Sequence, residues 1–421
     1  MYDGITFSCS AQCENPLATG GGFIIRPMPT KPTSQLSVTW KQVHAFRLAR
    51  HRLTELAAPK EIASVAYDMA GAQAQLLSAA QLSLGIRTQG LRVEDVEKAI
   101  EKKTLVKASC MRRTLFLVPA KQLALFTRGE ARRSEKEVNW AIRRGIPAKT
   151  IDAAIDAVIR ALEEPLTRPE IAERTSQILG LKKREVQGGG WGNKNKVAAV
   201  QVGHLTYPVV YLLSTAAARG VFCYGPYRGN EPTFVRADAW LPNWKDLSTE
   251  EAEGMLVRKY LQAYGPASET DFAMWASLSQ SEVRQMWASQ ASQLATVDVE
   301  GWKGTLLKKD LDALANAALP SPHVRLLPYF DTFILGHKER AHLVEKKHLP
   351  RIYSAQGWVS PVLLVDGRIA GLWKHAQEKD RLVITVEKFA SLPRPVLDRL
   401  HEQAQRIGSF LGSAKVDVQF K

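Results

Sequence analysis

Two glutamines separated by one small apolar residue, Gln73 and Gln75, are the side chains whose type and spacing could do chemistry. A neutral amide oxygen can stabilise a developing positive charge and hold an attacking water molecule. On an α-helix, residues i and i+2 point about 200° apart. Both amides can therefore line one pocket only if the backbone is extended here or turns at Gly71. A helix with both glutamines on its solvated side is the alternative.

The balance of charges predicts an anionic partner. The 421 residues include 57 Lys and Arg against 42 Asp and Glu, which gives a formal net charge of +15. This excess favours nucleic acid or an acidic membrane surface. No basic amphipathic helix with an aromatic apolar face stands out, and no apolar run approaches the ~20 residues that cross a bilayer. We therefore expect double-stranded DNA as the partner and no membrane.

Cysteine and histidine spacing indicates neither disulfides nor a metal site. The four cysteines, Cys9, Cys13, Cys110 and Cys223, form no CxxC pair and no disulfide framework. A reducing cytoplasm, with the protein at the nucleoid, is the expected location. The His, Cys and carboxylate spacings complete no zinc signature, so we expect no metal and no cofactor.

The order of predicted elements gives an α+β fold with three similar units and a different C-terminal domain. Residues 1–36 are rich in Gly, Pro, Ser and Thr and are expected to be a disordered tail. Units at 37–147, 148–245 and 246–322 each show helices followed by a two-stranded wing, the outline of a winged helix. Residues 323–421 are predicted to be a small β-rich domain.

The first unit carries most of the candidate phosphate contacts. A basic helix is predicted over 43–56, and its charged face is either a phosphate clamp or a solvated amphipathic side. Strands over 104–107 and 113–118 form the wing, and charge of one sign on a projecting hairpin suits DNA phosphates. The predicted DNA-contacting residues of this unit are Arg47, Arg50, Lys107, Arg112 and Arg113.

The second unit adds a Gly-rich basic loop. Residues 188–194 lack the GxxxxGK[ST] order and follow no predicted strand, so we interpret them as a flexible loop that touches the DNA backbone. Thr167 is expected to cap a helix. The other predicted elements are helices over 150–163 and 197–218 and wing strands over 221–224 and 233–235. The predicted DNA-contacting residues here are Lys194, Lys196 and Arg228.

Capping and turn residues define the rest of the chain. Ser268 and Ser279 are predicted N-caps in the third unit, whose wing spans 295–307. In the C-terminal domain, the pair Asp366-Gly367 predicts a two-residue hairpin turn between two strands. Asp331 is expected to cap or bridge backbone there and not to act as an acid or base. A helix over 394–411 and a strand over 416–420 end the chain.

Several segments together resemble one family, the winged-helix DNA glycosylases typified by AlkZ and YcaQ. The resemblance covers about residues 40–421. The segments that carry it are Gln73-Ala74-Gln75, Tyr264-Gly265-Pro266-Ala267, Asp271 to Trp275, Leu327 to Asp331 with Leu335-Gly336, and Val365-Asp366-Gly367 with Gly371-Leu372-Trp373. In one place the chain departs from the family pattern: Phe116 stands where a His is expected in the first wing.

The resemblance implies three tandem winged helices that form a curved basic channel, with a barrel-like β-rich C-terminal domain. It also implies excision of alkylated purines and, in some members, unhooking of interstrand crosslinks. The family's Gln-apolar-Gln motif falls on Gln73, Ala74 and Gln75, so these two glutamines are the predicted catalytic residues.

Glutamines suit one kind of leaving group. Glycosidic cleavage passes through an oxocarbenium-like state that a carboxylate usually stabilises. An amide is weaker, and it suffices when the base already carries positive charge, as a purine alkylated at N7 or N3 does. No lysine in the motif could form a Schiff base, so a monofunctional glycosylase is predicted. The alternative is a non-catalytic winged-helix DNA-binding protein or regulator; either protein would bind duplex DNA with little sequence preference, as a monomer.

Overall fold

Side-chain caps mark the starts of several helices where the sequence predicted them. The computed structural model describes residues 36–129, 131–187, 196–217, 219 and 221–421. Ser268 and Ser279 each accept a hydrogen bond from the backbone N–H three residues on. Thr167 is the N-cap residue of a third helix, and its backbone N–H and hydroxyl donate to Glu170 Oε2 at 2.7 and 2.9 Å. A cap of this kind contributes about 1 kcal/mol to helix stability, and the predicted caps are confirmed.

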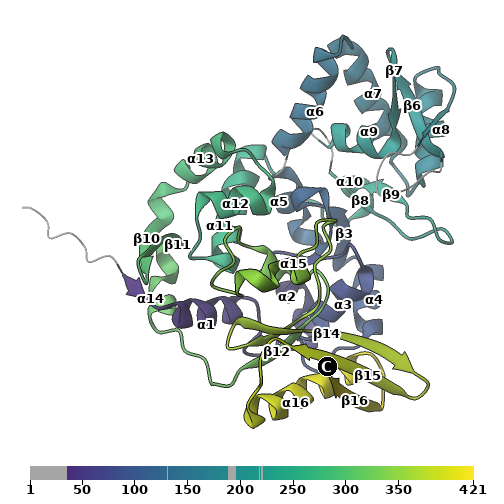
Figure 1. The fold of residues 1–421 in the computed structure, drawn as a ribbon. Coiled ribbons are helices and arrows are strands. Elements are labelled where there is room, and N and C mark those ends of the chain that lie inside the picture. Colours follow the sequence, from purple (N-terminus) through teal and green to yellow (C-terminus); the bar gives the residue numbers. More distant parts are fainter. Residues whose placement is uncertain (1–35, 130, 188–195, 218, 220) are drawn as a thin grey trace, which may run out of the picture. The chain divides into compact units, whose positions relative to one another are not determined.

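The first unit of the described chain places the glutamine segment beside a wing, whose strand β3 (Leu105–Ser109) lies near α4 (Val93–Glu101) in Figure 1. The wing strands pair as predicted, and a short strand that contains Gln73 adds a third, in the order β2-β4-β3. The elements are β1 (Ser37–Val38), α1 (Trp40–Arg50), α2 (Ile62–Asp68), β2 (Ala72–Gln73), α3 (Leu77–Gly85), α4 (Val93–Glu101), β3 (Leu105–Ser109), β4 (Leu115–Pro119), α5 (Leu123–Arg128) and α6 (Ala131–Arg143).

The second unit differs from the prediction over one helix. Residues 197–208 are not helical: β6 pairs with β5 and β7 in an antiparallel sheet, and the chain turns at Gly203, whose φ is +59°. The predicted helix is wrong there because the run is rich in valine, and a short apolar run does not distinguish strand from helix. The elements are α7 (Ala148–Ala161), α8 (Arg168–Ile178), β5 (Arg184–Gln187), β6 (Lys196–Val202), β7 (Leu205–Pro208), α9 (Val209–Ala216), β8 (Phe222–Tyr224), β9 (Phe234–Arg236) and α10 (Ala237–Trp240).

The third unit has the predicted helices and wing. Its wing strands are joined by β1, which pairs in parallel with β10, so the first described strand belongs to this sheet. The elements are α11 (Thr249–Tyr264), α12 (Glu269–Ala276), α13 (Gln280–Ala288), β10 (Leu294–Val299), β11 (Trp302–Leu307) and α14 (Leu311–Ala315).

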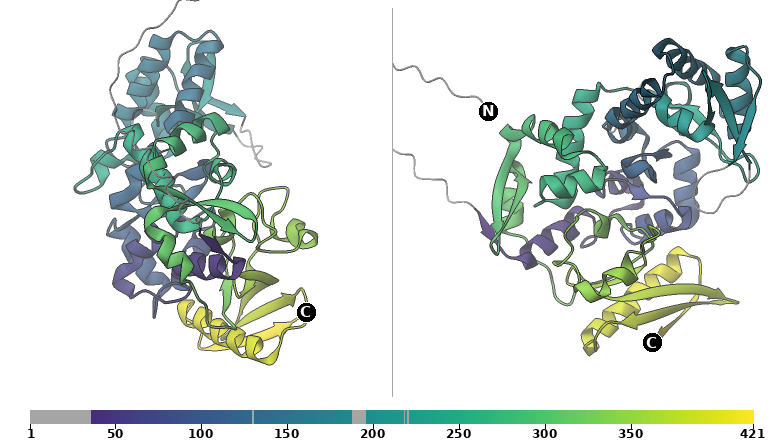
Figure 2. Two further views of the ribbon diagram at one scale, coloured as in Figure 1. Left: turned by 90° about the vertical axis from the view of Figure 1, so that its left-hand side faces the viewer. Right: turned by 45° about the horizontal axis from the view of Figure 1, so that its top comes forward.

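The C-terminal domain contains a five-stranded sheet in the order β12-β13-β14-β15-β16, with α16 packed against β12 and β16 (Figure 2). Asp366 and Gly367 both have positive φ, which confirms the predicted hairpin turn. The described strands β12 and β16 form opposite edges, so the barrel-like prediction is wrong. The elements are β12 (Val324–Leu327), α15 (Leu349–Ile352), β13 (Val362–Val365), β14 (Arg368–Glu378), β15 (Arg381–Lys388), α16 (Arg394–Phe410) and β16 (Lys415–Phe420).

The hydrophobic core crosses the predicted domain limits. One cluster of buried side chains includes Phe116 and Trp275, and another includes Leu117 and Leu400. Residues 36–421 form one compact body by their contacts. The domain limits, the number of winged helices and the curved channel therefore stay predictions.

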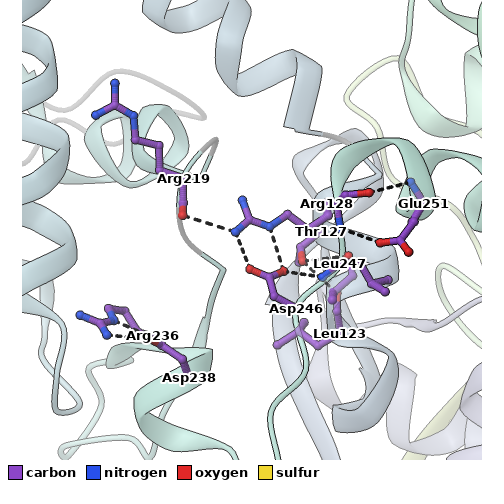
Figure 3. A network of polar contacts seen from close by, with 11 residues as sticks. Leu123, Thr127, Arg128, Arg219, Arg236, Asp238, Asp246, Leu247 and Glu251 are labelled. Carbon is purple, nitrogen blue, oxygen red and sulfur yellow. Dashed lines mark hydrogen bonds and ion pairs between the residues drawn. The ribbon is translucent and has the colours of Figure 1, made fainter.

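Ion pairs tie distant segments together and occupy many of the basic side chains. Arg128 at the end of α5 makes two hydrogen bonds to the Asp246 carboxylate, of 3.0 and 2.6 Å, and one of 3.3 Å to the backbone oxygen of Arg219 (Figure 3). Arg132 pairs with Glu253. Each such pair is neutral and leaves the net charge of +15 unchanged, but a count of basic residues overstates the number of cations that are available to a ligand.

We expect the folded state to lose stability as the pH falls below about 6.5, because histidines are buried as neutral rings. Burial is the largest cause that lowers the pKa of His44, to about 3, and those of His51 and His337, well below 6.5. Their folded pKa values lie below the unfolded value, so the unfolded state binds more protons in acid. Each such group removes about 1.4 kcal/mol per pH unit between the two pKa values.

Urea unfolding midpoints measured from pH 7.5 to 5 test this expectation, and the midpoint is expected to fall steadily below pH 6.5. A single variant, His51→Gln, is expected to flatten that slope. An unchanged slope in this variant would contradict the assignment to His51.

Both described cysteines, Cys110 and Cys223, are buried and neither forms a disulfide. Burial raises the pKa of the Cys223 thiol to about 12. Within the described ranges no helix is long and apolar enough to cross a membrane. The same residues contain no group of three or more His, Cys, Asp or Glu side chains arranged to hold a metal ion.

Candidate functional site

The first glutamine of the motif lies in a strand and is buried. Gln73 is 7% exposed and stands opposite Phe116 in the register of β2 and β4. The ladder continues one residue further, since the Ala74 N–H donates to the Leu115 oxygen at 2.6 Å. Gln75 lies at an exposed bend just before α3. The backbone is therefore extended at Gln73, and the alternative of a helix with two solvated glutamines is wrong.

A glycine makes this path possible. Gly71 has φ of +88°, and a Cβ atom there would meet Phe116 Cδ1 at 3.0 Å and Val118 Cγ1 at 3.1 Å. Its N–H donates to the Ala66 oxygen at 2.7 Å and so closes the end of α2. Only glycine adopts such a φ without strain while packing this closely. The chain can then pass from α2 to β2 through only three residues, 69–71.

Arg112 is the side chain that holds Gln73. Its guanidinium donates to Gln73 Oε1 at 3.0 Å and to the Trp275 backbone oxygen at 2.7 Å. Arg112 itself has φ of +58°, so the turn between β3 and β4 aims this side chain back at the strand. The bond links the glutamine to the end of α12, 163 residues away in sequence from Arg112.

Phe116 occupies the position where the family resemblance predicts a histidine. Its ring is fully buried across the ladder from Gln73, and the Arg112 guanidinium carbon lies 5.9 Å from the ring centre. A phenyl ring offers no hydrogen bond to an amide. Arg112 therefore supplies the polar contact to Gln73 that Phe116 cannot.

Arg47 is too deeply buried to contact a DNA phosphate in this structure, which corrects its prediction as a DNA-contacting residue. The side chain is buried and donates to the backbone oxygens of Gly265 at 3.4 Å and Pro266 at 2.6 Å. Burial lowers the pKa of Arg47 to about 10, which still leaves it cationic at neutral pH. Sequence spacing could not reveal a partner more than 200 residues away. Arg50, on the same helix, forms an ion pair with Asp310.

The other basic candidates differ in their surroundings. Arg113 is paired with Glu137, and the Lys107 ammonium is 3.3 Å from the Tyr227 hydroxyl. Arg228 is exposed, yet it is held by Glu170 and by the Pro165 oxygen. Lys196 is exposed at the first position of β6. Lys194 lies outside the described residues.

Two exposed aromatic side chains were missed from the sequence. Tyr329 is 38% and Trp358 44% exposed, and their rings meet edge to face at 6.1 Å. Phe330 packs against Trp358 and belongs to a hydrophobic cluster that also contacts Leu76, next to Gln75. Exposed aromatic faces suit base stacking. No spacing in the sequence connects positions 329 and 358, so only the fold could bring them together.

Comparison with known proteins finds DNA glycosylases similar to this chain. The family model described as "DNA glycosylase AlkZ-like" matches residues 66–410. The interstrand DNA cross-link repair glycosylase of Streptomyces sahachiroi is 28% identical over 395 residues, which are 91% of this chain and all of that protein. The solved structure of Streptomyces sahachiroi DNA glycosylase AlkZ has a TM-score of 0.75 at 27% identity, covering 92% of this chain and 100% of that chain.

Proposed function

Because the chain belongs to the AlkZ-like DNA glycosylase family, whose model matches residues 66–410, we propose that it excises cationic alkylated purines from duplex DNA. Family membership makes it a DNA glycosylase, a hydrolase of N-glycosyl bonds, with DNA as its partner, as the sequence predicted. The observation that carries the finer proposal is the pair of amides, one buried and held by Arg112 and one exposed at the adjoining bend.

The chemistry follows from what amides can do. An N7- or N3-alkylated purine carries positive charge, leaves readily and is neutralised as it departs. The sugar then becomes positive at C1′, and an amide oxygen nearby stabilises that charge and orients water. The motif contains no lysine, so water and not an amine attacks.

The two glutamines do not share one role in this proposal. The Arg112 cation already donates to Gln73 Oε1, and a cation beside that oxygen disfavours further positive charge there. Gln73 is better suited to orienting the substrate or the attacking water. The exposed Gln75 amide is then the group that meets the developing charge at C1′.

Crosslinked DNA is a second proposed substrate. The Streptomyces relative is named for interstrand cross-link repair, and this chain spans all of that protein's length. A crosslink through purine N7 leaves the same cationic bond at each end. We propose that the same glutamines unhook it by hydrolysing one of these bonds.

The deciding experiment follows the products of N-glycosyl bond hydrolysis. Full-length protein is incubated with duplexes that contain N7-methylguanine, a nitrogen-mustard crosslink or undamaged guanine. Free base is quantified for the first and third duplexes, and separation of the two strands on a denaturing gel is quantified for the crosslinked duplex. The proposal expects free N7-methylguanine from the first duplex, separated strands from the second and no free base from the third. A non-catalytic regulator, the alternative, would bind all three duplexes and release nothing.

We expect duplex affinity to fall steeply with salt and to depend little on sequence. The remaining candidates Arg50, Lys107, Arg113, Lys196 and Arg228 would neutralise phosphates and release counterions. Fluorescence anisotropy between 50 and 200 mM salt measures the slope, and Arg113→Ala is expected to reduce it by about one. Affinity that barely changes over this range would overturn the phosphate contacts. A monomeric state and a location at the nucleoid belong to the same proposal.

A further inference from the structure

A cavity of about 780 Å³ lies away from the glutamine site, between the end of α3, the segment 320–326 and one face of α16. Gln73, Gln75 and Arg112 are not among the residues that line it. Its volume is in the range of small-molecule sites and is several times that of a phosphate ion. A ligand that fills this cavity is therefore larger than a phosphate group alone.

Two residues that line this cavity contain buried polar atoms without hydrogen-bond partners in the described part of the chain. Arg325 is 6% and Thr88 3% exposed, and neither Arg325 Nε nor Thr88 Oγ1 has a hydrogen-bond partner among the described residues. The remaining Arg325 nitrogens donate only to backbone oxygens, of Val324 at 3.0 Å and Thr54 at 3.4 Å. Burying a donor without a partner costs about 1–3 kcal/mol, and more when the group is charged.

Within the described residues no carboxylate pairs with Arg325. Arg406 on α16 lines the same cavity, and it too pairs with no carboxylate among these residues. Two carboxylates line the cavity as well: that of Glu402 is taken by Arg399 at 3.0 Å, and that of Glu55 belongs to an exposed residue. Burial, followed by the positive charge of Arg406, lowers the pKa of Arg325 to about 10, which leaves Arg325 cationic at neutral pH. Three arginines, Arg325, Arg399 and Arg406, against two carboxylates give the cavity an excess of positive charge, which favours an anionic ligand.

We propose that this cavity, through Arg325 and Arg406, binds a phosphate group carried by a larger molecule. A guanidinium presents donors in a planar fork that matches phosphate oxygens. The phosphate comes either from the DNA backbone or from a free phosphate ester. The site does not depend on the excision proposed above.

The test compares two variants on the same helix. Arg406→Gln removes an exposed cation of the cavity, while Arg394→Gln removes one that pairs with Asp398 and lies outside it. In the first arm, inorganic phosphate is titrated into full-length protein at constant ionic strength and the melting temperature is recorded. Wild type and Arg394→Gln are expected to show a saturable rise over chloride. Arg406→Gln is expected to bind phosphate roughly tenfold more weakly, because it loses a charge-assisted hydrogen bond.

In the second arm, duplex affinity is measured for the same proteins. A loss specific to Arg406→Gln, with a salt slope lower by about one, assigns the phosphate to DNA. A phosphate effect without that loss assigns it to a free ester. Either result supports the site. If Arg406→Gln and Arg394→Gln behave alike in both arms, the proposal is overturned, whether or not the protein releases damaged bases.

Discussion

Replacing both glutamines by alanine is expected to bring excision of N7-methylguanine close to the spontaneous rate. Loss of one preorganised dipole typically costs on the order of 10²–10³ in rate. Gln75→Ala should show most of this loss, because the exposed amide is the one assigned to C1′. Gln73→Ala should lower the rate by less. Single-turnover rates measure both effects.

The matched control for these variants is Gln280→Ala, which removes an exposed glutamine at the start of α13. It should leave the rate unchanged. Duplex affinity should also stay near wild type in every variant, because an amide carries no charge to meet a phosphate. A double variant that excises at the wild-type rate would show that neither glutamine takes part in catalysis.

Arg112 provides a second test of the same site. As a positioning residue, Arg112→Gln should slow excision about as much as Gln73→Ala and add little in the Gln73→Ala background. Such non-additivity is expected of groups in contact. As a phosphate contact, it would instead weaken duplex binding and lower the salt slope by about one in either background. Rate and affinity measured on the four proteins separate the two roles.

Breaking the ion pair between Arg87 and Asp331 is expected to cost the most stability. Both side chains are 0% exposed, and the two guanidinium nitrogens each donate to a different carboxylate oxygen at 2.7 Å. Asp331 also accepts from Ser83 Oγ at 2.9 Å and from the Phe333 backbone N–H at 3.1 Å. The latter contact confirms the prediction that this carboxylate caps backbone. Asp331→Ala leaves a buried guanidinium unpaired, a loss of about 3–5 kcal/mol.

The double variant Arg87→Met, Asp331→Leu is the informative comparison. Apolar side chains of similar volume in place of a buried pair are often tolerated. We expect it to unfold at a higher urea concentration than Asp331→Ala. At a temperature where both are folded, both should excise N7-methylguanine at rates near wild type. Loss of excision in folded Asp331→Asn, with duplex binding intact, would make the carboxylate catalytic and this assignment wrong.

Local signals in the sequence predicted what local physics determines. Caps at Ser268 and Ser279, the turn at Asp366-Gly367 and the wing strands of the first and third units are all present. The helix predicted over 197–208 is wrong because a short apolar run is compatible with either a helix or a strand. Pairing with β5 stabilises the strand. The barrel-like expectation came from the resemblance, and strand order is not a local property.

In the candidate site, too, local geometry was predictable from the sequence and contacts between distant residues were not. Glutamine spacing left two possibilities open, a solvated helix and a backbone that is extended or turns at Gly71, and the fold has the turn and the extended strand. Arg47 and Arg50 both lie on a helix, as predicted, yet helical spacing could not show that Arg47 faces two carbonyls 218 and 219 residues further on. Arg112 was assigned to phosphate because its sequence neighbours are basic. Its actual partners, Gln73 and the Trp275 oxygen, lie on other elements.

The rates at which the two buried thiols are alkylated would measure how often the core opens. Cys110 and Cys223 belong to the same hydrophobic cluster, one beside the Arg112 turn and the other on β8. An alkylating reagent reacts with the thiolate of an accessible cysteine. Burial protects both thiols, and it also raises the pKa of Cys223. The rate of labelling therefore reports how often each thiol becomes exposed. With Cys9 and Cys13 changed to serine, mass spectrometry could resolve the rate at each position. Equal rates would mean that the wing that holds the glutamine and the β8 hairpin open as one body.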